Sequence, residues 1–346
     1  MDVRLSSEQQ ALRNSVAQVV GRLGPGTVRD LDDTERCAKL DAAVAASGWR
    51  ELRVPLEGRA PLASGVESAV VAEELGRGLA DTPFLGPTLA AELRRLAGAP
   101  PSDATETVAF AGTLAAAATM ASGTPPGTVA PDARGATTAL VLVPDGPRHV
   151  LASVPLGPSH PGTDLTRPGA VVEPGPAVPV EGPDLRPLTD DDLSTWTALG
   201  LSLACADLVG VMRGAVDLAV GYACDRRQFD RPIGSFQAVQ HLLADAYVGM
   251  EGSRSVALHA AWSVDALRPD DALVAAAVAK AYCARAARTV CETAIQVHGG
   301  IGNTWECLAH VFLRRALLST AVLGGVGASL DRVVAHHGIG GRRGLR

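Results

Sequence analysis

The sequence of 346 residues contains few aromatic residues and almost no lysine. Aromatic residues make up 3% of the chain, and only Lys39 and Lys280 are lysines. A core with so few large rings must be built mainly from Ala, Leu and Val, and such small side chains favour closely packed helices. Hydrophobic residues make up 47% of the chain and charged residues 20%, a composition that excludes an intrinsically disordered protein.

Several functional classes lack their usual signals. A net charge of −6 leaves no basic surface for nucleic acid. Residues 1–10 carry acids and glutamines where a signal peptide would be basic and then apolar. The uncharged stretch 110–131 is interrupted by glycine and proline, which argues against a membrane span. None of the six cysteines forms a CxxC pair, so we expect no metal site and a soluble, reduced, cytoplasmic protein.

The first hundred residues have helical patterns. Ser6 and Ser7 precede Gln9 and Gln10 at the spacing of a capping box, and apolar residues then recur at helical intervals until Gly24. Further helices are predicted at about 28–47, 66–80 and 87–97. We therefore expect an N-terminal α-helical domain over residues 1–100.

The middle of the chain has a different composition. Sixteen of the 23 prolines lie from Pro100 to Pro187, which excludes long helices there. Asp145 and Gly146 are typical of a hairpin turn between two β-like runs. Such runs lie at 106–112, 136–144 and 148–156. We expect a shortened middle β domain over 101–187, whose last thirty residues are mostly irregular.

Helical periodicity returns after residue 187, now in longer units. Helices are predicted at about 190–225, 235–265, 271–297 and 305–323. The alanine-rich stretch 275–287 permits close helix–helix approach. The fold class is therefore mainly α with a β domain, and residues 188–346 are predicted to form a C-terminal four-helix bundle.

The segment CDRRQFDRPIGSFQ at 224–237 places an arginine cluster at the bend between two helices. A guanidinium group presents a fork of donors to anionic oxygens, so the cluster is suited to a phosphate. The alternative is a surface loop whose arginines pair with Asp225 and Asp230.

The segment QVHGGIGNTWE at 296–306 ends a long helix with glycines, and Thr304 can cap the next helix. Backbone amides at a glycine-rich break can approach a phosphate or ribose closely. No strand precedes the glycines, so the segment is not a dinucleotide-binding fingerprint. The spacing of twelve between His298 and His310 fits no short metal motif, and core or capping roles are favoured for both.

Together the two segments resemble the acyl-CoA dehydrogenase family of flavoproteins. They combine RxxFxxPIxxFQ, from Arg226 to Gln237, with QxHGGIGxTxE about sixty residues later. LSSEQQALRNSV and VAEELGRGLADTPFLG, near the N-terminus, also look like segments of that family. The resemblance covers nearly the whole chain and implies the same helix–β–helix order, with FAD bound between the β domain and the bundle.

The resemblance also implies roles for individual residues. Arg226 would contact the pyrophosphate of FAD, with Phe229 and Gln237 beside it. Gln296, Gly299 and Gly300 would hold the adenosine end of a flavin from a neighbouring subunit. Asp230 stands where the family usually has glycine, and we expect Arg227 or Arg231 to neutralise it.

The chemistry implied by the family is α,β-dehydrogenation of an acyl-CoA, in which a carboxylate removes the α-proton while a hydride passes to the flavin. The usual glutamate positions fall at about Leu323 and near Gly200, and neither residue is an acid. The nearest carboxylate is Asp207, for which a capping or interhelical contact is the alternative role. Glu306 is predicted to be a structural acid near a helix start.

The predicted β domain contains no Trp from 100 to 190, so its flavin-facing half looks degraded by comparison with the family. Three hypotheses follow: a subunit that completes the FAD site of a hetero-oligomer, a self-sufficient homo-oligomeric dehydrogenase using Asp207 or another acid, and a non-redox or structural relative that binds acyl-CoA. The resemblance also implies a tetramer, degradation of fatty-acid or steroid side chains, and an electron-transfer flavoprotein as acceptor.

Overall fold

The computed structural model describes residues 4–102, 104–120, 123–125 and 127–338, and it begins with helices. The first helix starts with a capping box, because Ser6 accepts from the Gln9 backbone N–H while the Gln9 side chain accepts from the Ser6 N–H. The helices are α1 (Ser7–Leu23), α2 (Thr34–Ala46), α3 (Gly65–Arg77) and α4 (Leu85–Ala97), with 3-10 turns η1 (Val28–Asp32) and η2 (Trp49–Glu51) and the short strands β1 (Pro55–Glu57) and β2 (Ala60–Pro61).

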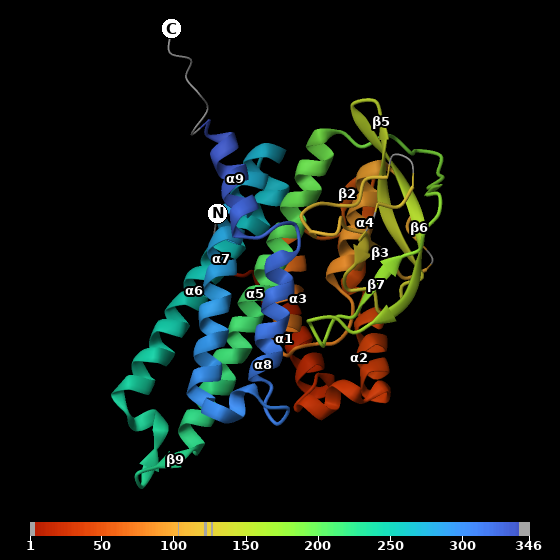
Figure 1. Ribbon diagram of the computed structural model, residues 1–346. Coiled ribbons are helices and arrows are strands. Elements are labelled where there is room, and N and C mark those ends of the chain that lie inside the picture. The colour runs from red at the N-terminus through yellow and green to blue at the C-terminus, as the bar shows by residue number, and fades with distance from the viewer. Residues whose placement is uncertain (1–3, 103, 121–122, 126, 339–346) are drawn as a thin grey trace.

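A curled sheet follows and lies beside α4 (Figure 1). Its strands run in the order β3-β5-β6-β7-β4, with β8 paired to β6; β3 and β5 are parallel and the other pairs antiparallel. The strands are β3 (Glu106–Val108), β4 (Val129–Ala130), β5 (Thr138–Asp145), β6 (Arg148–His160), β7 (Gly169–Val172) and β8 (Val178–Pro179).

The C-terminal part is a bundle of long helices, from which a short hairpin projects at one end (Figure 1). Thr189 caps the first helix by accepting from the Asp192 N–H. The elements are α5 (Asp190–Asp225), β9 (Arg227–Gln228), β10 (Arg231–Pro232), η3 (Ile233–Ser235), α6 (Gln237–Ala266), α7 (Pro269–His298), η4 (Gly299–Asn303), α8 (Ala309–Ala321) and α9 (Val326–His336).

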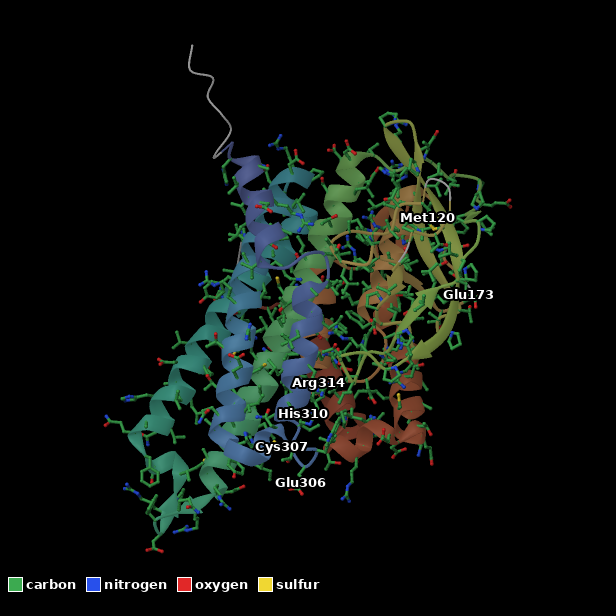
Figure 2. The ribbon with its side chains drawn as sticks, in the orientation of Figure 1. Met120, Glu173, Glu306, Cys307, His310 and Arg314 are labelled. Carbon is green, nitrogen blue, oxygen red and sulfur yellow. The ribbon has the colours of Figure 1, made fainter. Side chains whose placement is uncertain are left out.

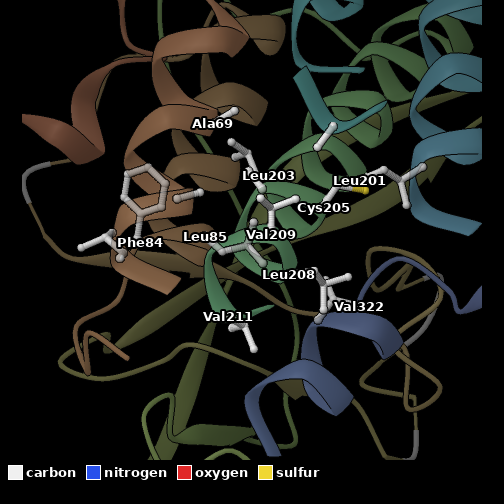
Figure 3. Packing of buried hydrophobic residues seen from close by; sticks show 14 of the residues in the cluster. Ala69, Phe84, Leu85, Leu201, Leu203, Cys205, Leu208, Val209, Val211 and Val322 are labelled. Carbon is white, nitrogen blue, oxygen red and sulfur yellow. The ribbon is translucent and has the colours of Figure 1, made fainter. Parts of the chain in front are cut away.

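The helices before and after the sheet share one hydrophobic core, whereas the sheet has a smaller core of its own. Figure 3 shows side chains of α5 packed among Ala69, Phe84 and Leu85 of the N-terminal part. A Cβ added at Gly210 would lie 1.9 Å from the Glu73 carbonyl oxygen, so α3 and α5 touch through backbone. Small residues at such crossings account for the low aromatic content of the core.

By length and composition alone, two helical stretches of the described chain could cross a membrane, Asp190–Asp225 and Ala309–His336. The first is α5, and its most apolar window is 94% buried within the fold. A helix that is apolar on all sides is expected in the core of a large domain. The second stretch is divided, because α8 ends at Ala321 and α9 begins at Val326.

The predicted fold class is confirmed, and most predicted helices lie within two or three residues of the observed ones. The single helix at 28–47 is wrong: the chain forms η1 and then α2, because the Asp33 side chain accepts from the Arg36 N–H and starts a new helix. The hairpin turn lies one residue later than predicted, at Gly146 and Pro147. The domain boundaries 1–100, 101–187 and 188–346 remain our proposal.

Candidate functional site

The arginine segment forms a hairpin at the end of α5. Phe229 and Asp230 both have positive φ, of 52° and 63°, and form the two-residue turn between β9 and β10. Such a turn favours Asn, Asp and Gly, so the phenylalanine is strained there whereas the aspartate is tolerated. The Phe229 side chain is 86% exposed at this turn.

The arginines of the hairpin differ in their contacts. Arg227 donates to the backbone carbonyl of Asp230, over 2.9 Å, and the Arg231 guanidinium lies 4.1 Å from the ring centroid of Phe236. Among the described residues no ion pair joins the Asp230 carboxylate to these arginines, so the predicted neutralisation is not seen. The Arg226 side chain is exposed and makes no ion pair or hydrogen bond with the described part of the chain, and its fork is open to a ligand.

The glycine segment follows directly from α7. Gly299 ends the helix with a φ of 64°, a conformation that glycine adopts without strain. A Cβ added at Gly299 or Gly300 would meet nothing within 4 Å, so this backbone is open to close approach. Thr304 does not cap the next helix as predicted: its hydroxyl donates to the Ile301 carbonyl, over 2.8 Å, and α8 begins later, at Ala309. Glu306 is exposed ahead of that helix (Figure 2).

The two segments lie at the same end of the bundle. Tyr222 in the last turn of α5 stacks on His298 in the last turn of α7, with ring centroids 4.5 Å apart. Arg226 follows Tyr222 by one turn, and Gly299 follows His298. All six residues for which the resemblance implies a flavin contact are exposed here: Arg226, Phe229, Gln237, Gln296, Gly299 and Gly300.

An open arginine fork beside an open glycine turn fits the phosphate and ribose of FAD. The exposure of the surface means that a flavin seated on it would need cover from another chain. We name this set of six residues the flavin surface. Their contacts with FAD remain predictions.

The two positions to which the resemblance assigns the catalytic glutamate, at about Leu323 and near Gly200, lie against each other. A Cβ added at Gly200 would be 2.3 Å from Leu323 Cδ1 and 3.3 Å from Leu89 Cδ2. Two positions that are 123 residues apart in the sequence thus meet at one point, as expected of alternative positions for one base. Neither is an acid, and the side chains of Leu89 and Leu323 fill the space between them.

The turn that carries Leu323 is held from three sides. Its N–H donates to the Leu114 carbonyl over 2.7 Å, and its carbonyl accepts from Arg332 over 2.9 Å. The buried Lys280 Nζ donates to the carbonyls of Ser319 and Val322 over 2.7 and 2.6 Å. Burial lowers the pKa of Lys280 to about 8. Leu323, with a φ of 59° and 1% exposure, is therefore fixed pointing inward.

Asp207 lies in a buried ion-pair cluster between the bundle and the sheet. Its Oδ1 accepts from Arg315 Nε and Nη2 over 2.9 and 2.6 Å, and its Oδ2 accepts from Ser319 over 2.5 Å and lies 3.5 Å from Arg167 Nη1. Burial raises the pKa of the Asp207 carboxyl, but the charges of Arg167 and Arg315 and these hydrogen bonds outweigh it and hold that pKa below its usual range.

This environment does not suit a general base. A base needs a lone pair within reach of the substrate and a pKa near the working pH, whereas both oxygens of Asp207 are occupied by cations and a hydroxyl. The geometry favours the alternative role for Asp207, an interhelical contact, over catalysis. The partners Arg167 and Arg315 come from distant parts of the chain, and no local sequence pattern predicts their contact with Asp207.

A hollow of about 310 Å³ lies between strands β4 and β7 and helix α8. Its wall is mostly apolar, from residues such as Leu114, Val129, Leu317 and Leu318. Arg167 is also at its wall, but the guanidinium is taken up by Asp164, over 2.7 Å, and by the Asp207 cluster. His160 and Thr163, both exposed, are polar residues of the same wall.

Known proteins resemble this chain over most of its length. Residues 201–337 match the family model described as "Acyl-CoA dehydrogenase, C-terminal domain". The "Acyl-CoA dehydrogenase IpdE2" of Mycolicibacterium smegmatis is 31% identical over an alignment that covers 96% of this chain and 99% of that relative. This chain belongs to the acyl-CoA dehydrogenase family. Acyl-CoA dehydrogenases are FAD-dependent oxidoreductases, and the predicted family, enzyme class and cofactor are confirmed at that level.

Two solved structures share the whole fold. A chain of the "ChsE4-ChsE5 complex from Mycobacterium tuberculosis" superposes with a TM-score of 0.79 at 25% identity, over 98% of this chain and 99% of the other. A chain of the "Tcur3481-Tcur3483 steroid ACAD" superposes with a TM-score of 0.78 at 25% identity, over 96% and 98%. Both titles name a pair of proteins.

Proposed function

We propose that this chain is a subunit of a hetero-oligomeric acyl-CoA dehydrogenase and completes an FAD site whose catalytic base lies on a partner chain of the same family. The contact between Gly200 and Leu323 carries the proposal. The two positions that the resemblance assigns to the base hold glycine and leucine, and leucine side chains fill the space around them. The hydrogen bonds that occupy Asp207 support the view that this acid does not act as a substitute.

The flavin surface gives this chain its part in the reaction. FAD, when bound, supplies the acceptor for the substrate β-hydride. Arg226 would neutralise the pyrophosphate through its open fork, and Gln296 would donate to polar edges of the adenosine end. Gly299 and Gly300 would let backbone N–H groups come close, since no Cβ stands in the way.

The matched structures support the pairing and the substrate class. Both structures are named for a pair of proteins, and one of them is named a "steroid ACAD". We accordingly propose that the complex oxidises acyl-CoA thioesters from fatty-acid or steroid side chains. A cytoplasmic tetramer that passes its electrons to an electron-transfer flavoprotein completes the proposal.

The test is purification of this chain alone and after co-expression with a family member that carries the missing glutamate. We expect a colourless chain alone and a yellow complex that reduces a dye with acyl-CoA. Arg226→Ala and Gln296→Ala should each lower the FAD content of the complex, because they remove contacts made only to the cofactor.

Arg288→Ala is the matched control, since Arg288 is an exposed arginine on the helix of Gln296 and, among the described residues, forms an ion pair only with Glu292 on the surface. It should leave FAD content unchanged. A chain that is yellow and oxidises acyl-CoA without a partner would support the self-sufficient enzyme instead. A chain that binds neither flavin nor a family partner would support the non-redox relative.

A further inference from the structure

Three side chains meet where α5, α7 and α8 converge at the end of the bundle. The Tyr222 and His298 rings stack with an interplanar angle of 26°. His298 Nδ1 lies 2.7 Å from the Ala294 carbonyl oxygen, which only accepts, so Nδ1 is the donor. The Cys307 thiol and the His298 imidazole shift each other's pKa, so Cys307 lies near this ring. The three residues thus connect the ends of two helices to the start of a third.

Each of the three residues adjoins a part of the flavin surface or the segment that connects that surface to α8. The Tyr222 carbonyl accepts from the Arg226 N–H over 2.8 Å at the base of the hairpin. His298 directly precedes the Gly299–Gly300 turn. Cys307 Sγ lies 3.5 Å from the Ala309 N–H, where the chain leaves that turn and enters α8 (Figure 2).

The contact between Cys307 and His298 is electrostatic as well as steric. Burial raises the pKa of the Cys307 thiol, but the hydrogen bonds from His298 and from the Ala309 backbone outweigh it and lower that pKa. Burial alone would lower the pKa of His298, but the interactions with Cys307 and with the Ala294 backbone outweigh it and raise that pKa. The two shifts favour the charged form of both groups, so the thiol and the imidazole attract each other where α7 ends and the chain enters α8.

We propose that Tyr222, His298 and Cys307 are positioning residues, which keep the arginine hairpin and the glycine turn at the separation that one FAD molecule requires. This inference rests on the proposed function of the flavin surface. A ligand that bridges two separate segments is bound more tightly when those segments are already fixed relative to each other. The Tyr222–His298 stack joins the helix that carries the hairpin to the helix that carries the turn.

The first test needs only the purified chain and measures amide hydrogen exchange in Tyr222→Leu. Removing the stack should speed exchange about threefold to tenfold both in the hairpin, 225–236, and in the turn, 299–304, the range expected for losing one aromatic pair. Tyr222→Phe keeps the ring and should match the wild type. Faster exchange in the hairpin alone would overturn the proposal, because the two segments would then be independent.

The second test uses the yellow complex and titrates FAD into its apo form. Tyr222→Leu should weaken FAD binding by about threefold to tenfold, and Tyr222→Phe should restore it. Unchanged FAD affinity in Tyr222→Leu would overturn the positioning role. Arg226→Ala separates the two ideas: if it leaves FAD affinity unchanged, the proposed function fails, whereas the exchange experiment still decides whether the segments are coupled.

Discussion

At the residue scale, the sequence was informative about which groups are missing and less so about what the remaining groups contact. Counting along the family pattern located Leu323 and Gly200, and the structure brings these two together. The partners of Asp207 could not be read in the same way. Arg167 precedes it by forty residues and Arg315 follows it by 108, so only the tertiary fold unites them.

Replacing Asp207 tests whether its carboxylate stabilises the buried arginine cluster. Asp207→Asn should destabilise the chain by about 3–5 kcal/mol, because Arg315 would remain buried without its counter-charge and Arg167 would keep only Asp164. Urea unfolding would measure the loss. Asp217→Asn, an exposed change on the same helix, should cost less than about 0.5 kcal/mol.

The same variant separates stability from catalysis. If Asp207 is structural, the fraction of Asp207→Asn complex that still folds should turn over acyl-CoA at close to the wild-type rate. A folded variant whose rate falls by a factor of about a hundred or more would instead identify Asp207 as the base.

At the element scale, helices were predictable wherever a cap or a glycine marked their ends. The predicted span of α5 coincides with the observed one, because Thr189 caps its start and the arginine hairpin follows its end. Where two side chains could compete for a role, the prediction went wrong. Asp33 divides the helix predicted at 28–47, and Thr304 binds a carbonyl of its own turn instead of starting α8.

The joint between α1, α3 and α5 predicts a pH dependence. Burial raises the pKa of Glu74, but hydrogen bonds from Arg13, Arg213 and Arg77 outweigh it and lower the pKa to about 2. The unfolded value is higher, so the ionised carboxylate stabilises the fold fully above about pH 4.5, and this stability is lost as the pH falls toward 2. Its contribution at neutral pH is about 3 kcal/mol.

Urea unfolding of Glu74→Gln across pH would check this. The variant should be less stable than the wild type by about 3 kcal/mol at pH 7, and the difference should shrink below pH 4.5. Glu292→Gln, which breaks a surface pair with Arg288, should cost less than about 1 kcal/mol at any pH. A constant difference for Glu74→Gln would mean that its charge is not what stabilises the joint.

At the scale of the whole molecule, the helix–β–helix order followed from composition, because the prolines exclude long helices from the middle. Composition did not predict that the first and last helical parts share one core. The contact of α3 with α5 depends on Gly210 meeting the backbone of α3, an interaction between segments more than 130 residues apart. The six residues of the flavin surface, in contrast, could be assigned from the sequence through the resemblance, because they lie in two short motifs, and their contacts with FAD stay a prediction.

The architecture predicts the flavin content of the assembly. Since this chain offers an open surface at the end of the bundle and a mostly apolar hollow beside its sheet, each pair of unlike chains should hold one FAD. Native mass spectrometry and flavin absorbance of the complex would count it. Two FAD molecules per pair would show that this chain also cradles a flavin of its own.

The meeting of Gly200 and Leu323 also limits how this lineage can change. A glutamate introduced at 200 would collide with the Leu323 side chain, and one introduced at 323 would place a charge in a space lined by leucines, on a turn fixed by Lys280 and Arg332. No single substitution at either position restores a usable base. A chain that works as proposed could therefore become independent of its partner only through several simultaneous changes.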